Sequence, residues 1–403
     1  MRVLISGASI AGPALAFWLH RAGADVTVVE KARAPRPGGH AVDVRGAART
    51  VVEWMGLREA IRVRQVDERG WKMVDHRDRT MAAMPADAFG GEGIVAEIEI
   101  TRGDLAGILL DATRDAADYR YGDRITALAD GPDGVDVTFA SGTTGRYDVV
   151  IGADGVHSGV RGLAFGPDDD YVRYLGAYTA YFTITDPGDL DNWYLMYNEP
   201  GGRVAGIRPE RGGTAKAHLS FTHPTADYER LSPEEAVRLT TERMAGCRWR
   251  VPELVAQMPG SPDFYFDSIN QVHVKRWWRG RVALLGDAGY CGSPLAGLGT
   301  SMSLVGAYVL AGELATGADP ERAFAAYQET MADYVADGLQ LPPGGMTMFA
   351  PQGRLLIRAR ALSTTLSTRW PMRGLLAKQF GKADAITLTE NALVSAGMQA
   401  RPR

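Results

Sequence analysis

The first residues whose types and spacing could do chemistry form a glycine turn near the amino end of the chain. The stretch at 3–31, VLISGASIAGPALAFWLHRAGADVTVVEK, carries Gly7, Ser9 and Gly12 and closes on Glu30. In a G-x-G-x-x-G turn, the first glycine allows a sharp bend, the second lets a pyrophosphate approach the backbone, and the third lets strand and helix pack closely. Ser9 is a small substitute at the second position. A carboxylate such as Glu30 accepts ribose hydroxyls but repels a 2′-phosphate, so the pattern favours FAD or NAD over NADP at this turn.

Two strands and a helix must position this turn. Residues 2–6 form a short apolar run typical of a buried parallel strand, 13–23 have helical spacing, and 25–30 form a second strand. Bound phosphates would lie at the amino end of the helix, where free amides and a partial positive charge attract anions. The breaks at Gly7 and Pro13 argue against a secretion signal or a membrane-spanning helix. A plain strand–helix–strand unit without a ligand remains the alternative.

A second motif lies in the middle of the chain. Residues 147–161, YDVVIGADGVHSGVR, begin as a buried strand and turn at Asp154 and Gly155, with Ser158 and Arg161 beyond. Alone, this pattern could be any strand that ends in a polar turn.

A third motif, at 280–314, repeats this arrangement. The run RVALLG predicts a buried strand and puts Asp287 at its carboxyl end, where open α/β sheets bind ligands. The loop that follows contains Pro294, Gly297 and Gly299. We expect Thr300 or Ser301 to cap the next helix, which is apolar nearly all round and therefore predicted to be buried. The amino end of a buried helix behind a glycine loop is a site for negative charge.

In this order, the three motifs resemble those of the group A flavoprotein monooxygenases, aromatic hydroxylases with the p-hydroxybenzoate hydroxylase fold. The resemblance spans about residues 1–330 and includes TRGDLAGILL at 101–110, where Arg102 matches an arginine that contacts FAD in that family. It implies an α/β fold class, with a discontinuous Rossmann-like FAD-binding domain, an antiparallel β-sheet substrate domain and C-terminal helices. The implied boundaries are 1–72, 98–171 and 271–337 for the first, 73–97 and 172–270 for the second, and 338–403 for the helical segment.

The resemblance also implies a cofactor and a reaction. FAD would lie extended, be reduced by NADH or NADPH, react with O₂ to a C4a-hydroperoxide, and pass one oxygen atom to an aromatic or polycyclic phenol-like compound, of the kind met in secondary metabolism or antibiotic modification. Asp287 would bind the ribityl chain, and the helix start near Gly299 would face the flavin N1 and C2 carbonyl. Arg45, in the loop RPGGHAVDVRG, and Pro294 would lie near the flavin; no protein acid or base is assigned, and no metal is expected. The expected cofactor contacts are Gly7, Ser9, Ile10, Ala11, Gly12, Glu30, Lys31, Arg45, Arg102, Asp154, Gly155, Arg161, Gly286, Asp287, Pro294, Gly297, Leu298, Gly299 and Thr300.

Departures from the family pattern leave the reaction open. Ser9 replaces a glycine, Tyr290 stands where histidine is common, Ser301 stands where asparagine is common, and Gly306-Ala307 replaces an Asp-Ala pair. An FAD-dependent reductase or oxidase of the same fold and a non-catalytic dinucleotide-binding protein therefore remain alternatives. The sequence has no second G-x-G-x-x-G unit for a separate nicotinamide domain, which fits transient binding of NAD(P)H over the flavin.

Alternating runs between 172 and 270 predict an antiparallel sheet with one buried face, which would roof the flavin and bind substrate. We expect its inner face to carry Tyr178, Tyr181, Phe182, His218, Phe221 and Phe264. His218 could act as a base, but a hydrogen-bonded core histidine is the favoured interpretation. Phe349, with Met346 and Met348, is expected to line the substrate entrance.

A helix predicted at 351–370 is basic, with Arg354, Arg358 and Arg360. Such a helix can lie on a membrane surface. Here we expect the arginines to be solvated or paired and the apolar side chains to pack on the protein, namely Leu355, Leu356, Ala359 and Leu362.

The composition sets the remaining expectations. The 403 residues carry a net charge of −4, which favours neither nucleic acid nor a membrane as a partner. The two cysteines, Cys247 and Cys291, form no C-x-x-C pair, which argues against a disulfide framework or structural zinc and fits a reducing cytoplasm. We therefore expect a cytoplasmic monomer or homodimer whose partners are O₂, NAD(P)H and a small aromatic or polycyclic substrate.

Overall fold

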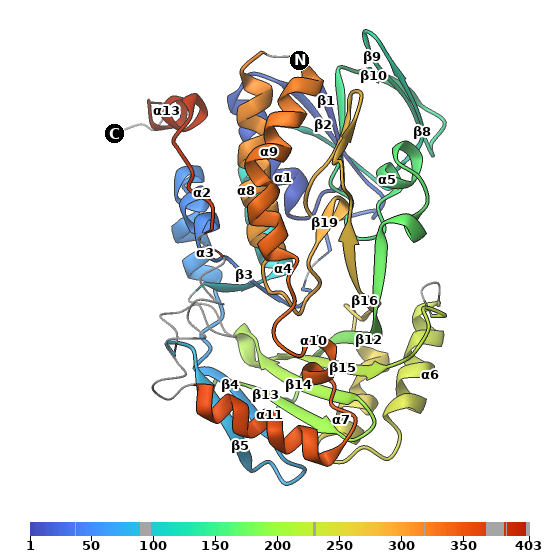
Figure 1. Ribbon diagram of the computed structural model, residues 1–403, viewed down its shortest axis with the longest axis vertical. Helices are drawn as coiled ribbons and strands as arrows, with labels where there is room; N and C mark the ends of the chain where they lie inside the picture. Colours follow the sequence, from blue (N-terminus) through green and yellow to red (C-terminus); the bar gives the residue numbers. More distant parts are fainter. Residues whose placement is uncertain are drawn as a thin grey trace.

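The computed structural model describes residues 1–36, 38–88, 98–228, 231–317, 319–367, 383 and 385–399. A mainly parallel, six-stranded sheet occupies one half of the molecule (Figure 1), in the order β17-β18-β11-β1-β2-β7. Its strands are β1 (Arg2–Ser6), β2 (Asp25–Glu30), β7 (Asp118–Tyr121), β11 (Val149–Gly152), β17 (Trp278–Arg279) and β18 (Val282–Leu284). The central strands are covered on both faces, so their side chains are apolar throughout, as in VVIG.

The register of this sheet brings three strand ends side by side. Ser6 of β1 pairs with Gly152 of β11, and Gly152 pairs with Leu284 of β18. Because these strands are parallel, the loops that follow them leave the sheet at the same edge. Those loops are the glycine turn, the turn that holds Asp154 and the turn that holds Asp287.

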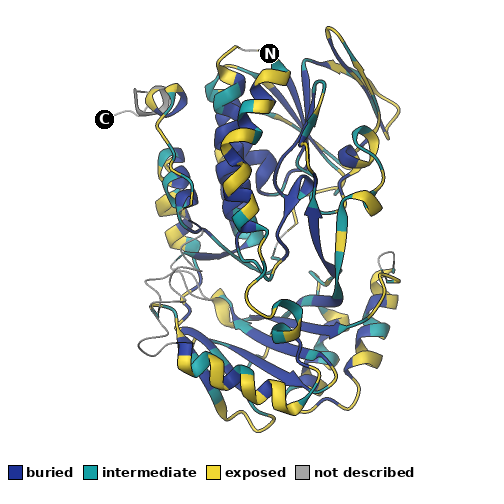
Figure 2. Cartoon of the chain, in the orientation of Figure 1, coloured by how far each residue is buried: buried dark blue, intermediate teal, exposed yellow. Residues whose placement is uncertain are grey.

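Helices pack beside this sheet and complete its apolar core (Figures 1 and 2). They are α1 (Ala11–Arg21), α2 (Ala47–Met55), α3 (Arg58–Arg64), α4 (Arg102–Thr113), α5 (Gly159–Ala164), α8 (Gly299–Ala315) and α9 (Pro320–Gly338). Trp18 of α1 meets Tyr308 of α8 edge to face, with ring centroids 5.0 Å apart. Most of α8 is buried, as its apolar sequence predicts.

An eight-stranded sheet forms the other half, in the order β19-β16-β12-β15-β14-β13-β4-β5. Its strands are β4 (Gly70–Val74), β5 (Thr80–Pro85), β12 (Val172–Ile184), β13 (Trp193–Glu199), β14 (Arg203–Pro209), β15 (Ala215–Thr222), β16 (Tyr265–His273) and β19 (Tyr290–Cys291). The pair β13 and β4 is parallel, and the other neighbours are antiparallel. The predicted fold class, a Rossmann-like parallel sheet joined to an antiparallel sheet and C-terminal helices, is confirmed.

The prediction that six side chains share one inner face of this sheet is wrong, because the structure divides them between its two faces. Tyr181 of β12 pairs with His218 of β15 on one face. Tyr178 lies three residues earlier and points to the other face, because side chains alternate along a strand. Four of the six predicted side chains pack on this opposite, apolar side, namely Tyr178, Phe182, Phe221 and Phe264.

Helices cover both faces of this sheet. On the apolar face lie α6 (Pro233–Met244) and α7 (Val251–Gln257). On the Tyr181 face, over β4, β5 and β13, lie α10 (Gly345–Phe349) and α11 (Arg354–Ser367). Ile357 and Ala361 of α11 pack there with Trp71, Met73 and Met196.

The outer side of α11 contradicts the expectation that its leucines pack on the protein. Leu355 is 81% exposed, Leu362 is 61% exposed and Leu356 is 39% exposed. The predicted helix itself is confirmed over 354–367, and residues 368–370 of the prediction lie outside the described part of the chain.

The remaining elements are smaller. A two-stranded pair joins β3 (Ala41–Asp43) and β6 (Glu99–Thr101), and a three-stranded sheet joins β8 (Ile125–Gly131), β9 (Gly134–Phe139) and β10 (Thr144–Tyr147); α13 spans Ala392–Gln399. Both cysteines are free and buried. Among the helices that the structure describes, none is long and apolar enough to cross a membrane. The domain boundaries stay a prediction, and 89–97 and 368–382 lie outside the described residues.

Candidate functional site

The glycine turn after β1 packs against the neighbouring loop and against α1. A Cβ on Gly7 would lie 2.4 Å from the carbonyl oxygen of Ala153, and the φ of Gly7 is 110°, a value that favours glycine. A Cβ on Gly12 would lie 1.9 Å from the carbonyl oxygen of Gly7. The N-cap residue of α1 is Ile10, which offers no side-chain hydrogen bond to the helix, and Ala11 begins the helix. Because the Ile10 side chain is apolar, the first amides of α1 have no side-chain cap.

Glu30, at the end of β2, clamps the same turn. Its Oε2 accepts a hydrogen bond from the Ala8 amide at 3.0 Å, and its Oε1 accepts one from the Ala32 amide at 2.8 Å. A carboxylate has about four acceptor positions, so the predicted ribose contact remains compatible with this holding role. Lys31, the next residue, is exposed.

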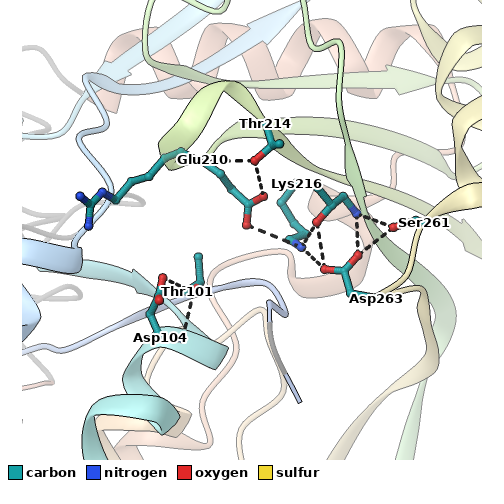
Figure 3. Close-up of polar contacts among 9 residues, drawn as sticks. Thr101, Asp104, Glu210, Thr214, Lys216, Ser261 and Asp263 are labelled. Atoms are coloured by element: carbon teal, nitrogen blue, oxygen red, sulfur yellow. Dashed lines mark hydrogen bonds and ion pairs between the residues drawn. The ribbon is translucent and has the colours of Figure 1, made fainter. Parts of the chain in front are cut away.

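Arg102 lies between two of the turns. It begins α4, whose N-cap Thr101 accepts a hydrogen bond from the Asp104 amide at 3.1 Å (Figure 3). Arg102 Nε donates to Ser9 Oγ at 3.2 Å. Burial raises the pKa of Asp287, and the positive charge of Arg102 offsets part of this rise. The structure thus connects Ser9 and Asp287, which the sequence motifs place separately, through one guanidinium.

The Asp287 turn touches the amino ends of two helices. It is a short 3-10 turn, Gly286–Ala288, directly after β18. A Cβ on Gly286 would lie 3.4 Å from the Cβ of Ala11 in α1. A Cβ on Gly299 would lie 3.4 Å from Asp287 Oδ1. The three predicted motifs therefore meet at one edge of the parallel sheet.

The amino end of α8 has no side-chain cap, so the prediction that Thr300 or Ser301 caps it is wrong. The N-cap position is held by Leu298. The Ser301 hydroxyl instead accepts a hydrogen bond from the Arg45 amide at 3.0 Å and lies 3.5 Å from the Asp43 carbonyl oxygen. The first amides of α8 therefore have no N-cap side chain as a partner, and a helix end of this kind favours negative charge.

Arg45 is buried beside this helix end. Its Nη2 lies 2.7 Å from Oδ2 of Asp43, and its Nε donates to the same oxygen at 3.0 Å. A Cβ on Gly297 would lie 3.8 Å from that oxygen, whereas Pro294 is exposed. The contacts predicted from Arg45 and Pro294 to flavin or reductant stay predictions.

The Asp154 turn is held from within. Asp154 accepts hydrogen bonds from the Ser158 hydroxyl, from the Val160 amide at 3.2 Å and from the Ser6 hydroxyl at 3.3 Å. Burial raises its pKa, and these hydrogen bonds oppose the rise. A Cβ on Gly155, whose φ is 84°, would meet nothing within 4 Å, so this glycine faces open space.

Arg161 is buried between two of the turns, and its predicted cofactor contact stays a prediction. Its side chain is fully buried, and its guanidinium donates to the carbonyl oxygen of Ala288 at 2.8 Å and to that of Val156. It also pairs with Asp168 at 2.6 Å. Arg161 therefore ties the Asp154 turn to the Asp287 turn and positions both.

A short glycine loop crosses from this edge to the eight-stranded sheet. The Gly38 carbonyl accepts a hydrogen bond from the Gly103 amide at 2.6 Å, and the His40 carbonyl accepts one from the Arg102 amide at 3.0 Å. The His40 ring stacks on Tyr181 with ring centroids 5.0 Å apart. Burial, helped by nearby positive charges, lowers the pKa of His40 to about 3, so this ring is neutral near neutral pH.

Figure 3 shows the buried Lys216 that this loop approaches. Its ammonium pairs with Asp263 and lies 3.6 Å from a carboxylate oxygen of Glu210. Although burial opposes it, hydrogen bonds, chiefly from Lys216, lower the pKa of Asp263 to about 2. A Cβ on Gly38 would lie 2.5 Å from Asp263 Oδ2, so the loop rests directly on this ion pair.

His218 lies on the same face and is a hydrogen-bonded core histidine, the interpretation that the sequence favoured. Its Nε2 and the Tyr194 hydroxyl are 2.8 Å apart. Burial lowers its pKa to about 4. A Cβ on Gly206 would lie 2.1 Å from His218 Nε2, so the absence of a side chain at Gly206 makes room for the imidazole.

Sequence reasoning missed the charged residues of this face. Arg208 of β14 pairs with the buried carboxylates of Glu68 and Glu99, and its guanidinium lies 4.9 Å from the Tyr194 ring centroid. Burial raises the pKa of Glu68 to about 7, although Arg208 opposes the rise. The available signal was a charged residue inside an otherwise apolar strand, as in GRVAGIRP for Arg208 and AKAHLSFTH for Lys216.

Phe349 ends α10 beside this face. Its ring is half-buried, and its carbonyl oxygen accepts hydrogen bonds from Asn198 at 3.1 Å and from Arg360 at 2.9 Å. The predicted role of Phe349 at a substrate entrance stays a prediction.

Comparison with known proteins adds to this geometry. The model of the FAD binding domain family matches residues 1–339. A flavin-dependent monooxygenase from an unknown prokaryotic organism is 38% identical over 336 residues, which cover 83% of this chain and 86% of that protein. The uncharacterized protein Rv1260 of Mycobacterium tuberculosis is 42% identical over 337 residues, covering 83% of this chain and 90% of that protein.

A solved structure agrees over nearly the full length. The crystal structure of tetracycline destructase Tet(55) superposes with a TM-score of 0.79 at 34% sequence identity, covering 96% of this chain and 98% of that one. This chain therefore belongs to the FAD binding domain family and has the p-hydroxybenzoate hydroxylase fold that its three motifs predict.

Proposed function

We propose that this protein is an FAD-dependent monooxygenase that uses NAD(P)H and O₂ to hydroxylate an aromatic or polycyclic phenol-like small molecule. The observation that carries the proposal is the meeting of the glycine turn, the Asp154 turn and the Asp287 turn at one sheet edge, beside the uncapped end of α8. The similar proteins support it, since one is a flavin-dependent monooxygenase and another is a tetracycline destructase.

The residues at this edge fit FAD. The uncapped amides of α1 would bind the pyrophosphate, and Glu30 would accept a ribose hydroxyl. Arg102 would place positive charge between the two helix ends. Asp287 would accept hydrogen bonds from the ribityl hydroxyls, and the first amides of α8, from Gly299, would face the polar edge of the flavin ring. When bound, FAD supplies hydride acceptance and oxygen activation.

The Tyr181 face of the eight-stranded sheet is the proposed substrate side. The loop at Gly38 joins this face to the cofactor side through the ion pair of Lys216 and Asp263. The neutral His218 and the Tyr194 hydroxyl form a hydrogen-bonded pair there that can hydrogen-bond a phenolic hydroxyl. These residues orient the substrate and exclude water, and the reactive chemistry belongs to the cofactor.

One experiment tests the proposal. The protein is purified, loaded with FAD and screened with phenolic compounds for stimulated oxidation of NADH and NADPH, and the product is analysed after turnover in ¹⁸O₂. The proposal predicts bound flavin and one labelled oxygen atom in the product. Stimulated NAD(P)H oxidation without label would favour a reductase or oxidase of the same fold. A protein that binds no FAD would contradict both activities.

A further inference from the structure

The outer side of α11 carries an exposed apolar stripe that the proposed site does not use. Leu355 is 81% exposed, Leu362 is 61% exposed and Leu366 is 45% exposed. At about 100° of rotation per residue, these three positions fall within about 40° of one another. They therefore form one line along the helix, on a different side from the buried Ile357 and Ala361. Figure 2 shows that α11 carries both exposed and buried residues.

Two exposed arginines lie next to this apolar stripe. Arg354 and Arg358 are exposed, and because they are four residues apart they lie on one side of the helix, next to the stripe. The sequence from 338 to 383 contains seven Lys and Arg residues and no Asp or Glu, although the whole chain has a net charge of −4. Among the described residues, Arg354 and Arg358 therefore place positive charge beside the exposed leucines, whereas Arg360 turns inward to Asn198 and the Phe349 carbonyl oxygen.

We propose that α11 docks on the surface of an anionic lipid bilayer, with Leu355, Leu362 and Leu366 at the boundary of the acyl chains and with Arg354 and Arg358 on headgroup phosphates. Helices that lie in the membrane interface have this division into an apolar line and a basic flank. Over its described residues, α11 is not long and apolar enough to span the bilayer. Its inner side is already packed through Ile357 and Ala361, so docking requires no folding step.

Other occupants fit the charge pattern less well. In a symmetric contact with a second copy, the same stripes would face each other, and Arg354 and Arg358 of both chains would meet without a carboxylate from the segment. A nucleic acid would attract the arginines but would gain nothing from three exposed leucines. Anionic lipid satisfies both features, and the proposal is independent of the proposed monooxygenase activity.

Co-sedimentation of the full-length protein with large unilamellar vesicles tests the proposal. One set of vesicles contains phosphatidylcholine with about one third phosphatidylglycerol, and the other contains phosphatidylcholine alone. The variants are Leu355→Ser/Leu362→Ser/Leu366→Ser and Arg354→Gln/Arg358→Gln. The matched control is Val63→Ser, because Val63 is 56% exposed on α3, away from α11. Circular dichroism establishes that each variant is folded.

The proposal predicts binding to the anionic vesicles, weaker binding at high salt, and on the order of tenfold or more weaker partitioning for both multiple variants. The control should bind like the wild type. Lack of binding to anionic vesicles, or equal binding by the leucine variant, would overturn the proposal. So would a concentration-dependent dimer, seen by sedimentation velocity and lost in the leucine variant, if the wild type ignores vesicles. If the leucine variant fails to fold, the arginine variant decides the outcome alone.

Discussion

Removal of the Asp287 carboxylate should weaken FAD binding without destabilising the unliganded protein. Burial raises the pKa of Asp287, and Arg102 and the Cys291 thiol offset this only in part. The ionised carboxylate is therefore held in the folded chain at a cost, and hydrogen bonds from a ribityl chain would offset that cost. Because the folded-state pKa lies above the unfolded one, ionisation lowers stability as the pH rises through that interval. Near neutral pH, Asp287→Ala should leave the Tm of the apoprotein unchanged or raised.

The expected loss of affinity follows from one charged hydrogen bond. Such a bond contributes about 1.5–3 kcal/mol, and about 1.4 kcal/mol corresponds to a tenfold change in Kd. Asp287→Ala should therefore raise the Kd for FAD on the order of 10- to 150-fold. The matched control is Asp154→Ala, because the Asp154 carboxylate is used inside its own loop by Ser158 and Val160. Its removal leaves these donors without their acceptor, so the Tm of the apoprotein should fall.

The assay is titration of each apoprotein with FAD, followed by quenching of flavin fluorescence, together with thermal unfolding in the absence of FAD. Equal Kd values for the wild type and Asp287→Ala would refute the reasoning. A lowered Tm of the Asp287→Ala apoprotein would also refute it, since the carboxylate would then be a structural element of the turn.

The remaining predictions concern the glycine turn and the His218 pair. Gly12→Ala forces a Cβ to within 1.9 Å of the Gly7 carbonyl oxygen, so the FAD content of the purified protein should drop sharply; full occupancy would contradict the predicted packing. Gly206→Ala places a Cβ 2.1 Å from His218 Nε2. It should lower kcat/KM on the order of tenfold, which corresponds to the loss of about one hydrogen bond, and leave the Kd for FAD unchanged. An unaltered kcat/KM would show that this face is not part of the substrate site. The pKa of His218 is lowered to about 4, so the stability that it contributes is present above about pH 6.5 and is lost as the pH falls toward 4. Between about pH 7 and pH 5, the wild type should therefore lose about 2 kcal/mol more unfolding free energy than His218→Gln does. Urea unfolding at the two pH values measures this difference, and equal losses would contradict the prediction.

The parts of the fold that follow from local pattern could be predicted from the sequence. Apolar runs that end in Gly7, Asp154 and Asp287 are parallel strands whose loops share one edge, because parallel strands place their carboxyl ends together. Arg102 also reaches this edge and contacts Ser9. The resemblance of this chain to one known family connected the three separated motifs. No single motif could have made that connection.

The parts that depend on tertiary contacts could not be predicted. Ser301 has a residue type and a position suited to a helix cap, but its hydroxyl instead accepts a hydrogen bond from the Arg45 amide. Arg161 is charged and sits in a motif, yet carbonyl groups of two turns bury it.

Strand parity alone separates two of the predicted inner-face residues. Tyr178 and Tyr181 are an odd number of residues apart in one strand, and they could not share a face. The exposure of Leu355 had no sequence signal, because an amphipathic helix does not reveal which of its two apolar sides meets the protein.

The most direct test of the central claim is a crystal structure of the protein with FAD. The account predicts one FAD per chain, with its adenosine at Glu30, its pyrophosphate at the amino end of α1, its ribityl chain at Asp287 and its flavin ring before Gly299. Flavin density at a different place, or an FAD that leaves either Glu30 or Asp287 without contact, would contradict the claim that these loops form one site.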